Sequence, residues 1–383
     1  MKKISVFLGA YLWTIFLCFS IFAQEFKTIQ DGVEYAEMTR GTKEEPVRIN
    51  LLRLDLTKVR LDVAHAMDAA IGLEKTSSIA ARYGALAAIN GGFFRLDRSI
   101  FAGDPTGVLK IDGKLLSEDY NGRIAFLIEN KADKTEVYFE HLNLSATLSV
   151  GEQFLELSGI NRERKQDELL VFTPEFNRTT LTNPNGLEVI VRQRKIVQVT
   201  DGKGSSLIPP DGFVLSASGK RREELLRYAK IKAEVEFFYH YAKFGDYLAL
   251  KPKLSAPFPA SEDITGGVPQ LIKNGKIEIT WQQEKSSKEF VETRHPRTAA
   301  AKLKDGKFLL VTVDGRQAGY SVGMNLNELA AFLLELGAQD AMNLDGGGST
   351  TMFLDGKVAN KPSDKEGERS VSDAILVFPR KKN

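Results

Sequence analysis

Residues 307–350 read KFLLVTVDGRQAGYSVGMNLNELAAFLLELGAQDAMNLDGGGST, and this stretch decides the fold that the sequence predicts. It opens with an apolar run that predicts a buried strand ending at Asp314. Asn325 and Glu328 form a capping box, which predicts a helix with one apolar face. The run DAMNLD predicts a second strand, which ends at Asp345. A strand, a helix and a strand of these lengths indicate a crossover that places both aspartates at the same, carboxyl, edge of a sheet.

Much of the remaining chain alternates apolar and polar residues, the period-two pattern of strands. Residues 47–64 predict two strands that meet at a turn. After them, a short helix capped by Ser77 or Ser78 leads into a buried strand that ends at Asn90. We expect a mixed α/β (α+β) fold: a mixed β-sheet with packed helices, a ligand pocket at strand ends, and a β-rich insertion at about residues 109–261.

The composition is that of a globular protein without a strong charge bias. The chain has 383 residues, 43% hydrophobic and 27% charged, and a formal net charge of +2. Its basic residues are scattered, apart from the run at residues 380–382, so no footprint for nucleic acid stands out. We therefore expect no nucleic-acid partner. The sequence does not specify the oligomeric state.

Residues 1–23 have the pattern of a signal peptide, in which Lys2 and Lys3 precede a long uncharged run. The run is long enough that an uncleaved membrane anchor is the alternative, and it would be the chain's only membrane contact. Cys18 lies inside it, so residues 24–383 would contain no disulfide and no cysteine metal site. We expect one domain over residues 24–383 in a periplasmic or secreted bacterial protein.

Four short segments share one pattern, an apolar strand that ends in a polar residue and glycine. They are AINGGFF (residues 88–94), DITGGVPQLIKNG (263–275), VTVDGR (311–316) and MNLDGGGST (342–350). Three consecutive glycines are conformationally costly, and they let backbone N–H groups approach an anion without a Cβ in the way. The repeated pattern predicts that these segments converge on one pocket. A fifth segment, ETRHPRTAAA, adds Arg294, His295 and Arg297.

Several familiar sites are not specified. GGGST lacks the lysine of a nucleotide-binding loop, and the segment after it predicts a hairpin instead of a helix. No G-x-S-x-G motif surrounds Ser349, which argues against a serine hydrolase. No histidine cluster exists, and the aspartates lack the spacing of a calcium loop. We therefore predict no certain cofactor or metal site, and leave a divalent cation bound by Asp345 as an alternative.

These segments, together with PRTAA, the stretch at residues 313–350 and the late GERSVSDAILV, resemble the phosphodiester glycosidase family in motif and order. The resemblance covers about residues 32–90 and 265–377. One departure is Val268, which stands where the family pattern has a third glycine. The pocket that the resemblance implies comprises Asn90, Gly91, Gly92, Gly266, Gly267, Arg297, Thr298, Asp314, Gly315, Arg316, Asp345, Gly346, Gly347, Gly348, Ser349, Thr350, Glu368 and Arg369.

Roles can be predicted for the charged members of this pocket. Asp345, with Asp314 if it is near, would support the oxocarbenium-like transition state of a glycosidase. Arg297 and Arg316 would grip phosphate oxygens, aided by N–H groups of the glycines. The expected function is hydrolysis of the glycosidic bond of a sugar-1-phosphodiester, such as an N-acetylglucosamine-1-phosphodiester, in envelope or scavenged glycans.

Plainer interpretations remain open beside these. Asp-Gly pairs are common turn formers, which applies to Asp314 as well. Arg297 could pair with Glu292, and Glu368 and Arg369 could belong to a solvated loop. His295 could be purely structural. Two other functions also remain: a non-catalytic anionic-glycan-binding protein of exopolysaccharide assembly, and a glycosidase for ordinary glycosidic linkages.

Overall fold

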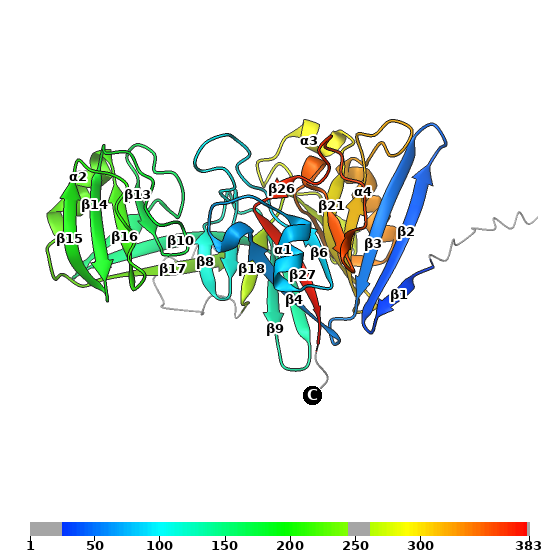
Figure 1. Cartoon of the computed structure of the whole chain (residues 1–383), viewed down its shortest axis with the longest axis horizontal. Coiled ribbons are helices and arrows are strands. Elements are labelled where there is room, and N and C mark those ends of the chain that lie inside the picture. Colours follow the sequence, from blue (N-terminus) through cyan, green and yellow to red (C-terminus); the bar gives the residue numbers. More distant parts are fainter. Residues whose placement is uncertain (1–24, 244–260, 381–383) are drawn as a thin grey trace, which may run out of the picture.

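The computed structural model describes residues 25–243 and 261–380 (Figure 1). The predicted signal peptide and the proline-containing segment near residues 252–259 lie outside the described residues. Within the described ranges, no helix is both long and apolar enough to cross a membrane.

An eight-stranded antiparallel sheet contains the strands predicted on either side of the crossover helix. Its order is β1 (Lys27–Gln30), β2 (Val33–Gly41), β3 (Pro46–Leu54), β22 (Phe308–Val313), β21 (Arg297–Leu303), β23 (Ala338–Asn343), β19 (Gln270–Lys273) and β20 (Lys276–Ile277). Strand β21 pairs antiparallel with both β22 and β23, so these two strands are parallel to each other but not neighbours.

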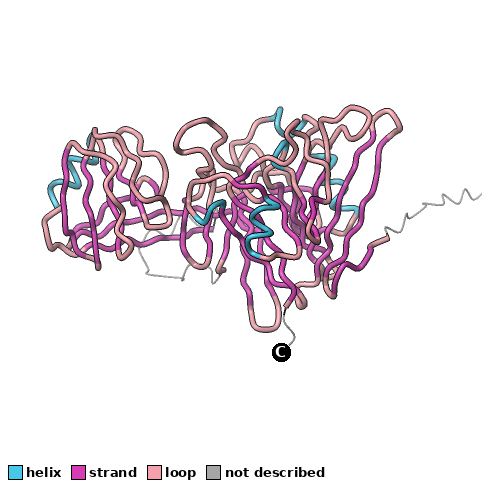
Figure 2. Tube along the Cα trace, in the orientation of Figure 1, coloured by secondary structure: helices cyan, strands magenta, loops and turns pink. Residues whose placement is uncertain are grey.

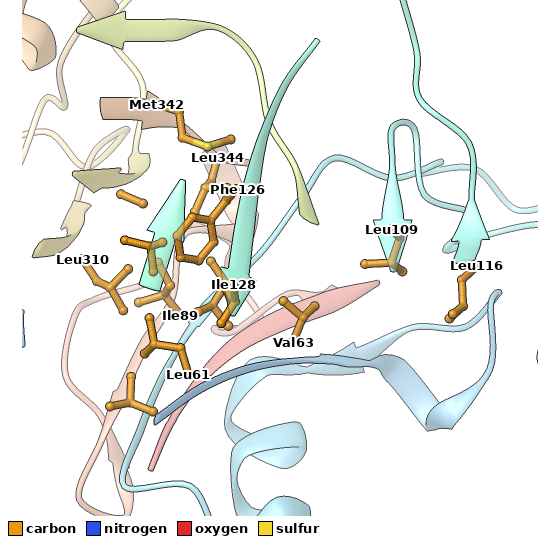
Figure 3. Packing of buried hydrophobic residues seen from close by; sticks show 14 of the residues in the cluster. Leu61, Val63, Ile89, Leu109, Leu116, Phe126, Ile128, Leu310, Met342 and Leu344 are labelled. Carbon is orange, nitrogen blue, oxygen red and sulfur yellow. The ribbon is translucent and has the colours of Figure 1, made fainter. Parts of the chain in front are cut away.

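Both faces of this sheet are buried, which explains the unbroken apolar run of β22. Leu309 and Val311 face helix α4 (Leu326–Glu335), whereas Phe308 and Leu310 face the main core. There the ring of Phe308 stacks on Phe126 at 5.2 Å between centroids. Figure 3 shows Leu310, Met342 and Ile89, from three different strands, around Phe126. Burying each such side chain stabilises the fold by about 1.5–3 kcal/mol.

A five-stranded sheet packs on the other side of this core. Its order is β25 (Lys357–Val358), β24 (Met352–Leu354), β6 (Ala87–Asn90), β27 (Asp373–Pro379) and β4 (Val59–His65). Helix α1 (Thr76–Tyr83) covers its outer face through Ile79 and Ala80. The small pair β5 (Glu74–Lys75) and β26 (Ser370–Val371) joins the start of α1 to the segment before β27. Two 3-10 turns, η1 (Ala66–Asp68) and η2 (Gly347–Ser349), and helix α3 (Lys288–Glu292) complete this part.

A third sheet leads from the core into a separate β-rich lobe, seen at the left of Figure 1. Its order is β11 (Gln153–Leu157), β10 (Thr135–Val150), β9 (Ile124–Asn130), β18 (Asp263–Gly266), β7 (Leu109–Ile111) and β8 (Lys114–Ser117), with β17 (Val235–Lys243) also paired to β10. The lobe adds helix α2 (Gly219–Tyr228) and a sheet in the order β12 (Gly159–Ile160), β13 (Leu169–Phe172), β16 (Gly212–Ala217), β14 (Leu187–Arg192) and β15 (Lys195–Asp201). Strand β10 belongs to both regions, since its first half pairs with β9 and its second half with β11 and β17.

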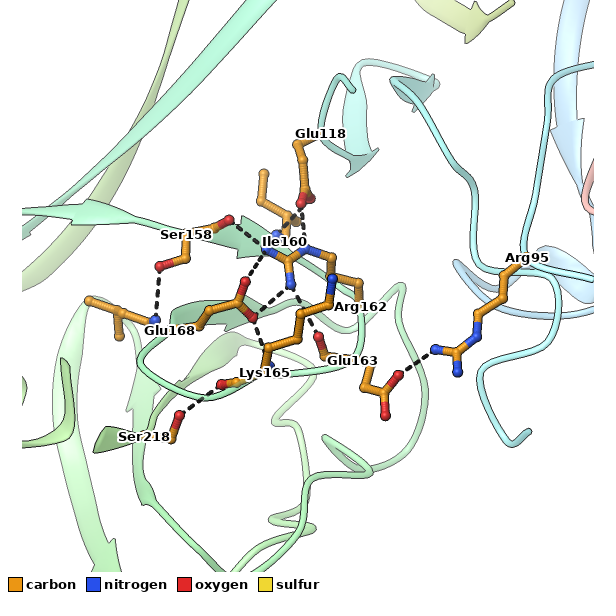
Figure 4. A network of polar contacts seen from close by, with 10 residues as sticks. Arg95, Glu118, Ser158, Ile160, Arg162, Glu163, Lys165, Glu168 and Ser218 are labelled. Carbon is orange, nitrogen blue, oxygen red and sulfur yellow. Dashed lines mark hydrogen bonds and ion pairs between the residues drawn. The ribbon is translucent and has the colours of Figure 1, made fainter. Parts of the chain in front are cut away.

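A polar network holds the lobe to the core at a second point, shown in Figure 4. Arg162 follows strand β12 of the lobe and donates to Glu118, at 2.5 Å, and to Glu168, at 2.8 Å. Glu118 directly follows core strand β8. Arg95, on a loop of the core, pairs with Glu163 of the lobe at 2.5 Å. The network therefore fixes how the lobe sits against the core.

The expected mixed α/β (α+β) fold class is confirmed only in part. Strands greatly outnumber helices, as Figure 2 shows, and the helices are short, so the chain is mainly β with sparse α-helix. The capping box of Asn325 and Glu328 is confirmed. The predicted caps of α1 are wrong, because Ser77 and Ser78 lie inside the helix and Lys75 is its N-cap residue. Strands β7 to β9, within the predicted insertion, pack into the main core.

Candidate functional site

Asp345 lies at the edge of the eight-stranded sheet where the sequence predicts it. Because β22 and β23 run parallel, Asp314 and Asp345 follow their strands at the same edge. Arg297 begins the strand between them and therefore lies at that edge too. The crossover pattern thus predicts the edge correctly, although a third strand separates the two aspartates.

The surroundings of Asp345 favour its neutral form. Its backbone N–H donates to the Gly91 oxygen at 3.1 Å, and its carbonyl accepts from Asn90 Nδ2 at 2.7 Å. Burial raises the pKa of Asp345 to about 6, and the nearby Asp373 acts in the same direction. The Ser349 hydroxyl, the Gly346 N–H and the charge of Arg369 oppose this shift. A partly buried carboxyl that titrates near neutrality is suited to proton transfer or to stabilising a cation.

Asn90 ties three segments of the site together. Its buried amide oxygen accepts from Thr298 Oγ1 at 2.8 Å and from the Thr351 N–H at 3.1 Å. The Thr298 hydroxyl also lies 3.4 Å from that of Thr350. Asn90 and Thr298 therefore join strands β6 and β21 to the loop after β23, which fixes the position of Asp345.

The three glycines each face an atom that a side chain would displace. A Cβ on Gly346 would lie 2.7 Å from the Pro296 oxygen. One on Gly347, whose φ is +63°, would lie 2.9 Å from Arg316 Nη1. One on Gly348 would lie 2.2 Å from Arg369 Nη2. Bare backbone at this loop thus lets two guanidinium groups approach it closely, which accounts for a conformationally costly sequence.

The two arginines over the glycine loop differ in their partners. Arg369 forms an ion pair with Asp364 at 2.8 Å. Arg316 is exposed and bonds His295, and it forms no ion pair within the part of the chain that the structure describes. Arg316 is therefore the cation of this loop whose charge a bound anion could pair with directly.

Arg297 donates its hydrogen bonds to backbone oxygens. It is almost fully buried and donates from Nε to the Met324 oxygen at 2.9 Å and from Nη2 to the oxygens of Phe290 and Thr293, both at 2.8 Å. These bonds fix α3 and the start of α4 against β21, and none involves Glu292. Only Nη1 stays outside these bonds, so the phosphate contact predicted for Arg297 remains a prediction.

Asp314 is also held by neighbours. Its buried carboxylate accepts from Asn360 Nδ2 at 2.9 Å and from the Lys361 N–H at 3.1 Å, and burial raises its pKa. Asn360 in turn donates to the Thr350 oxygen at 3.0 Å. Asp314 thereby anchors the segment at the end of the glycine loop, while Gly315 packs against the backbone of Pro296. The catalytic part predicted for Asp314 remains a prediction.

A carboxylate that the sequence interpretation missed lies beside Asp345. Asp373 opens strand β27, is 1% exposed, and accepts from the Gly92 N–H, from Thr265 Oγ1 at 2.7 Å and from Ser372 Oγ at 2.7 Å. Gly91 passes so close that a Cβ there would lie 2.1 Å from Asp373 Oδ2. An aspartate at the start of the apolar run DAILVF was the available signal.

A small hollow of about 10 Å³, with room for about one water molecule, adjoins these groups. It is lined by Gly92, Phe93, Pro105, Gly107, Val108, Leu109, Thr265, Gly266 and Asp373. A Cβ on Gly92 would strike the Gly266 oxygen at 2.7 Å, so these glycines let two loops meet at its wall. Gly267 lies just outside and packs on Asn343. Val268 is buried and is not part of the lining, so the departure from the family pattern does not narrow this hollow.

The carboxylate of Glu368 binds the first turn of helix α1. Its carboxylate accepts from the Ser77 N–H at 2.7 Å and from Ser77 Oγ at 2.5 Å, which satisfies the first turn of α1. Glu368 therefore anchors the segment that carries Arg369.

Within residues 25–243 and 261–380, no group of three or more histidine, cysteine, aspartate or glutamate side chains could hold a metal ion. The divalent cation on Asp345 remains an untested alternative.

Solved structures share this fold. A protein from Synechocystis superposes with a TM-score of 0.77 and 23% identity over 93% of this chain and 64% of its own. The catalytic domain of zebrafish N-acetylglucosamine-1-phosphodiester alpha-N-acetylglucosaminidase, in a form auto-inhibited by its pro-peptide, superposes with a TM-score of 0.50 and 18% identity over 92% of this chain and 86% of its own. At these identities the likeness concerns the fold.

Sequence comparison identifies the family. Bovine N-acetylglucosamine-1-phosphodiester alpha-N-acetylglucosaminidase is 39% identical over 110 residues, which is 26% of this chain and 20% of that enzyme. The chain thus matches about a fifth of the length of that relative. The sequence profile of the phosphodiester glycosidase family matches residues 185–378, just over half of the chain. That range includes Asp345 with the glycine loop, the two arginines over the loop, and Asp314 and Asp373. This chain therefore belongs to the phosphodiester glycosidase family.

Proposed function

We propose that this protein hydrolyses the glycosidic bond between a sugar and a phosphodiester. The observation that carries the proposal is that opposite charges lie around one short loop. Asp345, a partly buried carboxyl with a raised pKa, precedes three glycines over which Arg316 and Arg369 lie. A carboxylate beside two guanidinium groups matches a reaction that develops positive charge on a sugar and negative charge on a phosphate.

The chemistry follows from the leaving group. As the bond between the anomeric carbon and the phosphate oxygen breaks, its electron pair stays on the phosphate, whose negative charge Arg316 and Arg369 would stabilise. Asp345 would stabilise the positive anomeric carbon, either by bonding to it or by taking a proton from the attacking water. Asp373 is almost fully buried and already accepts several hydrogen bonds, so Asp345 is the better placed of the two to meet substrate.

The sugar would lie over the opening of the hollow beside these groups. The hollow has room for about one water molecule, and its lining combines apolar walls with the hydroxyl of Thr265 and the carboxylate of Asp373. The name of the bovine relative describes removal of N-acetylglucosamine from a 1-phosphodiester, and we extend that sugar class to this chain. The N-terminal sequence favours export, and therefore envelope or scavenged glycans as the source of substrate.

The test is release of free sugar by residues 24–383 from a panel of sugar-1-phosphodiesters and matched aryl glycosides. Wild-type protein should act on the phosphodiesters, and Asp345→Asn should lower kcat by about a thousandfold or more. Asp355→Asn is the matched control, because Asp355 lies in the exposed turn between β24 and β25 and should retain full activity.

Three results would contradict the proposal. Full turnover by Asp345→Asn would remove Asp345 from the chemistry. Faster release from the aryl glycosides would indicate an ordinary glycosidase, in which a protonated acid must assist a poorer leaving group. Binding of the phosphodiesters without any release would instead indicate a non-catalytic glycan-binding protein.

A further inference from the structure

The exposed cation of the glycine loop is held by a histidine. Arg316 Nε and Nη2 lie 3.3 Å and 3.2 Å from His295 Nδ1, so two nitrogens of the guanidinium converge on one ring nitrogen. Arg316 Nη1 faces the loop, 2.9 Å from where a Cβ of Gly347 would be. The side chain of His295 thus fixes which way Arg316 points.

This contact requires a neutral imidazole. A guanidinium can only donate hydrogen bonds, so His295 Nδ1 must accept, and the ring proton must be on Nε2. A protonated ring would place an N–H against the N–H groups of Arg316 and add a third positive charge beside Arg316 and Arg297. His295 would then repel the side chain that it now holds.

The charges around His295 favour its neutral form. Burial, followed by Arg297 at the start of β21 and Arg316 after β22, lowers the pKa of His295, and Glu289 of α3 opposes them. The adjacent Arg294 is paired with Glu328 of α4 and with Glu45. Arg316 is therefore held at neutral pH and released as the solution becomes acidic.

The position of His295 does not depend on its side chain. Its backbone N–H donates to the Met324 oxygen and its oxygen accepts from the Met324 N–H, both at 3.1 Å. Gly315 and Gly323 pack directly against the backbone of residues 295–296. The imidazole can accordingly be replaced while the backbone stays in place.

We propose that His295 is a positioning residue of the anion site: its neutral ring holds Arg316 over the glycine loop, and protonation of the ring weakens binding of the substrate phosphate. The proposal rests on the proposed function for the identity of the anion. It assigns His295 no contact with substrate, because its effect passes through Arg316. Asparagine at this position can accept at the place of Nδ1 but cannot gain a proton, so it separates the two properties.

The experiment measures the affinity for the methyl diester of N-acetylglucosamine 1-phosphate by calorimetry at about pH 7.5 and about pH 4. The lower pH is needed because the surroundings lower the pKa of His295, and a phosphodiester keeps one charge over the whole range. All proteins carry Asp345→Asn. This change stops turnover and removes a second group that titrates in the same range, whose protonation would favour an anion. The variants compared are His295→Asn, His295→Ala and Arg316→Ala, with the remote His141→Asn as the control.

The protein with His295 intact should lose about tenfold in affinity between the two pH values. His295→Asn should bind equally well at both, whereas His295→Ala and Arg316→Ala should bind about tenfold more weakly at pH 7.5. His141→Asn should behave like the parent. In the active protein, His295→Ala should raise KM more than it lowers kcat, and His295→Asn should restore KM.

An unchanged pH dependence in His295→Asn, or full affinity in His295→Ala, would overturn the proposal. Full affinity in Arg316→Ala would do the same. The binding measurement needs no turnover, so a failure of wild-type protein to release sugar would contradict the proposed function without deciding this one.

Discussion

At the scale of single residues, Asp345 gains chemical usefulness from surroundings that disfavour its charge. Burial raises its pKa to about 6, whereas an aspartate in an unfolded chain titrates near 3.8. A folded-state pKa above the unfolded value means that the folded protein loses stability as the pH rises between those two values. The same carboxylate is therefore both a candidate for chemistry and a source of instability at neutral pH.

Replacing this carboxyl should consequently stabilise the protein. Asp345→Asn is expected to raise the free energy of unfolding on the order of 2 kcal/mol at pH 7.5, allowing for the partial exposure of the side chain. The gain should shrink as the pH falls from about 6 to about 4, where the wild-type carboxyl is neutral as well. Denaturant unfolding at several pH values measures it. A gain of the same size at every pH would show that the carboxylate charge is not responsible.

At the scale of the element, the glycine loop joins a strand to two arginines, and its backbone geometry can be tested separately from its contacts. Gly347 and Gly84 both have positive φ, +63° and +68°. A Cβ at Gly84 would meet nothing within 4 Å, whereas one at Gly347 would meet Arg316 at 2.9 Å. The two positions thus share backbone strain but differ in what a side chain would displace.

Alanine at each position separates these effects. Gly347→Ala and Gly84→Ala should both lower the free energy of unfolding by about 1 kcal/mol, because alanine is strained at positive φ. Only Gly347→Ala should raise KM for the phosphodiester, by about tenfold, since it moves the guanidinium of Arg316. Thermal unfolding and steady-state kinetics measure the two quantities. An unchanged KM in Gly347→Ala would show that Arg316 does not need this position.

The elements also show which features a sequence can predict. Local periodicity identifies the strands, and the capping box of Asn325 and Glu328 identifies α4, because these signals depend on residues a few positions apart. The pairing of β21 with β23 brings together residues about 40 positions apart, which local patterns do not contain. The first turn of α1 is satisfied by Glu368, 291 residues away from Ser77, and no local rule could find it.

The same distinction between local signals and long-range contacts applies to the candidate site. The sequence identifies the glycine loop and the common edge of Asp314 and Asp345, since these follow from strand ends. It does not reveal Asp373, whose motif also fits a plain core strand. Nor does it reveal that Arg297 uses Nε and Nη2 on backbone oxygens, because an arginine's partners depend on three-dimensional packing.

At the scale of the whole molecule, Arg162 helps to hold the β-rich lobe to the core. Its guanidinium forms ion pairs with Glu118 of the core and Glu168 of the lobe. Each of these side chains is only about one-fifth exposed. Removing the cation would leave two carboxylates close together in a poorly solvated place. Arg192 offers a contrast, because its pair with Asp211 lies on the surface of the lobe.

Arg162→Met should lower the free energy of unfolding of the lobe by about 2 kcal/mol, whereas Arg192→Met should change it by less than about 0.5 kcal/mol. Hydrogen exchange measured by mass spectrometry should show faster exchange in β12, β13 and β16 for Arg162→Met alone. The strands around Asp345 should exchange at the wild-type rate. Equal protection of the lobe in both variants would show that the other contacts of the junction, such as Phe101 with Phe176 and Lys114 with Glu175, maintain it without Arg162.

Strand β27 also determines when the hollow can form during synthesis of the protein. It is the last strand along the described chain, yet it lies between β6 and β4 and brings Asp373 to Gly92. A ribosome releases these residues long after Asn90, and contacts so distant in sequence form late in folding. A nascent chain that has not reached residue 373 therefore cannot complete the hollow. Any activity that depends on this hollow therefore begins only after residue 373 has left the ribosome.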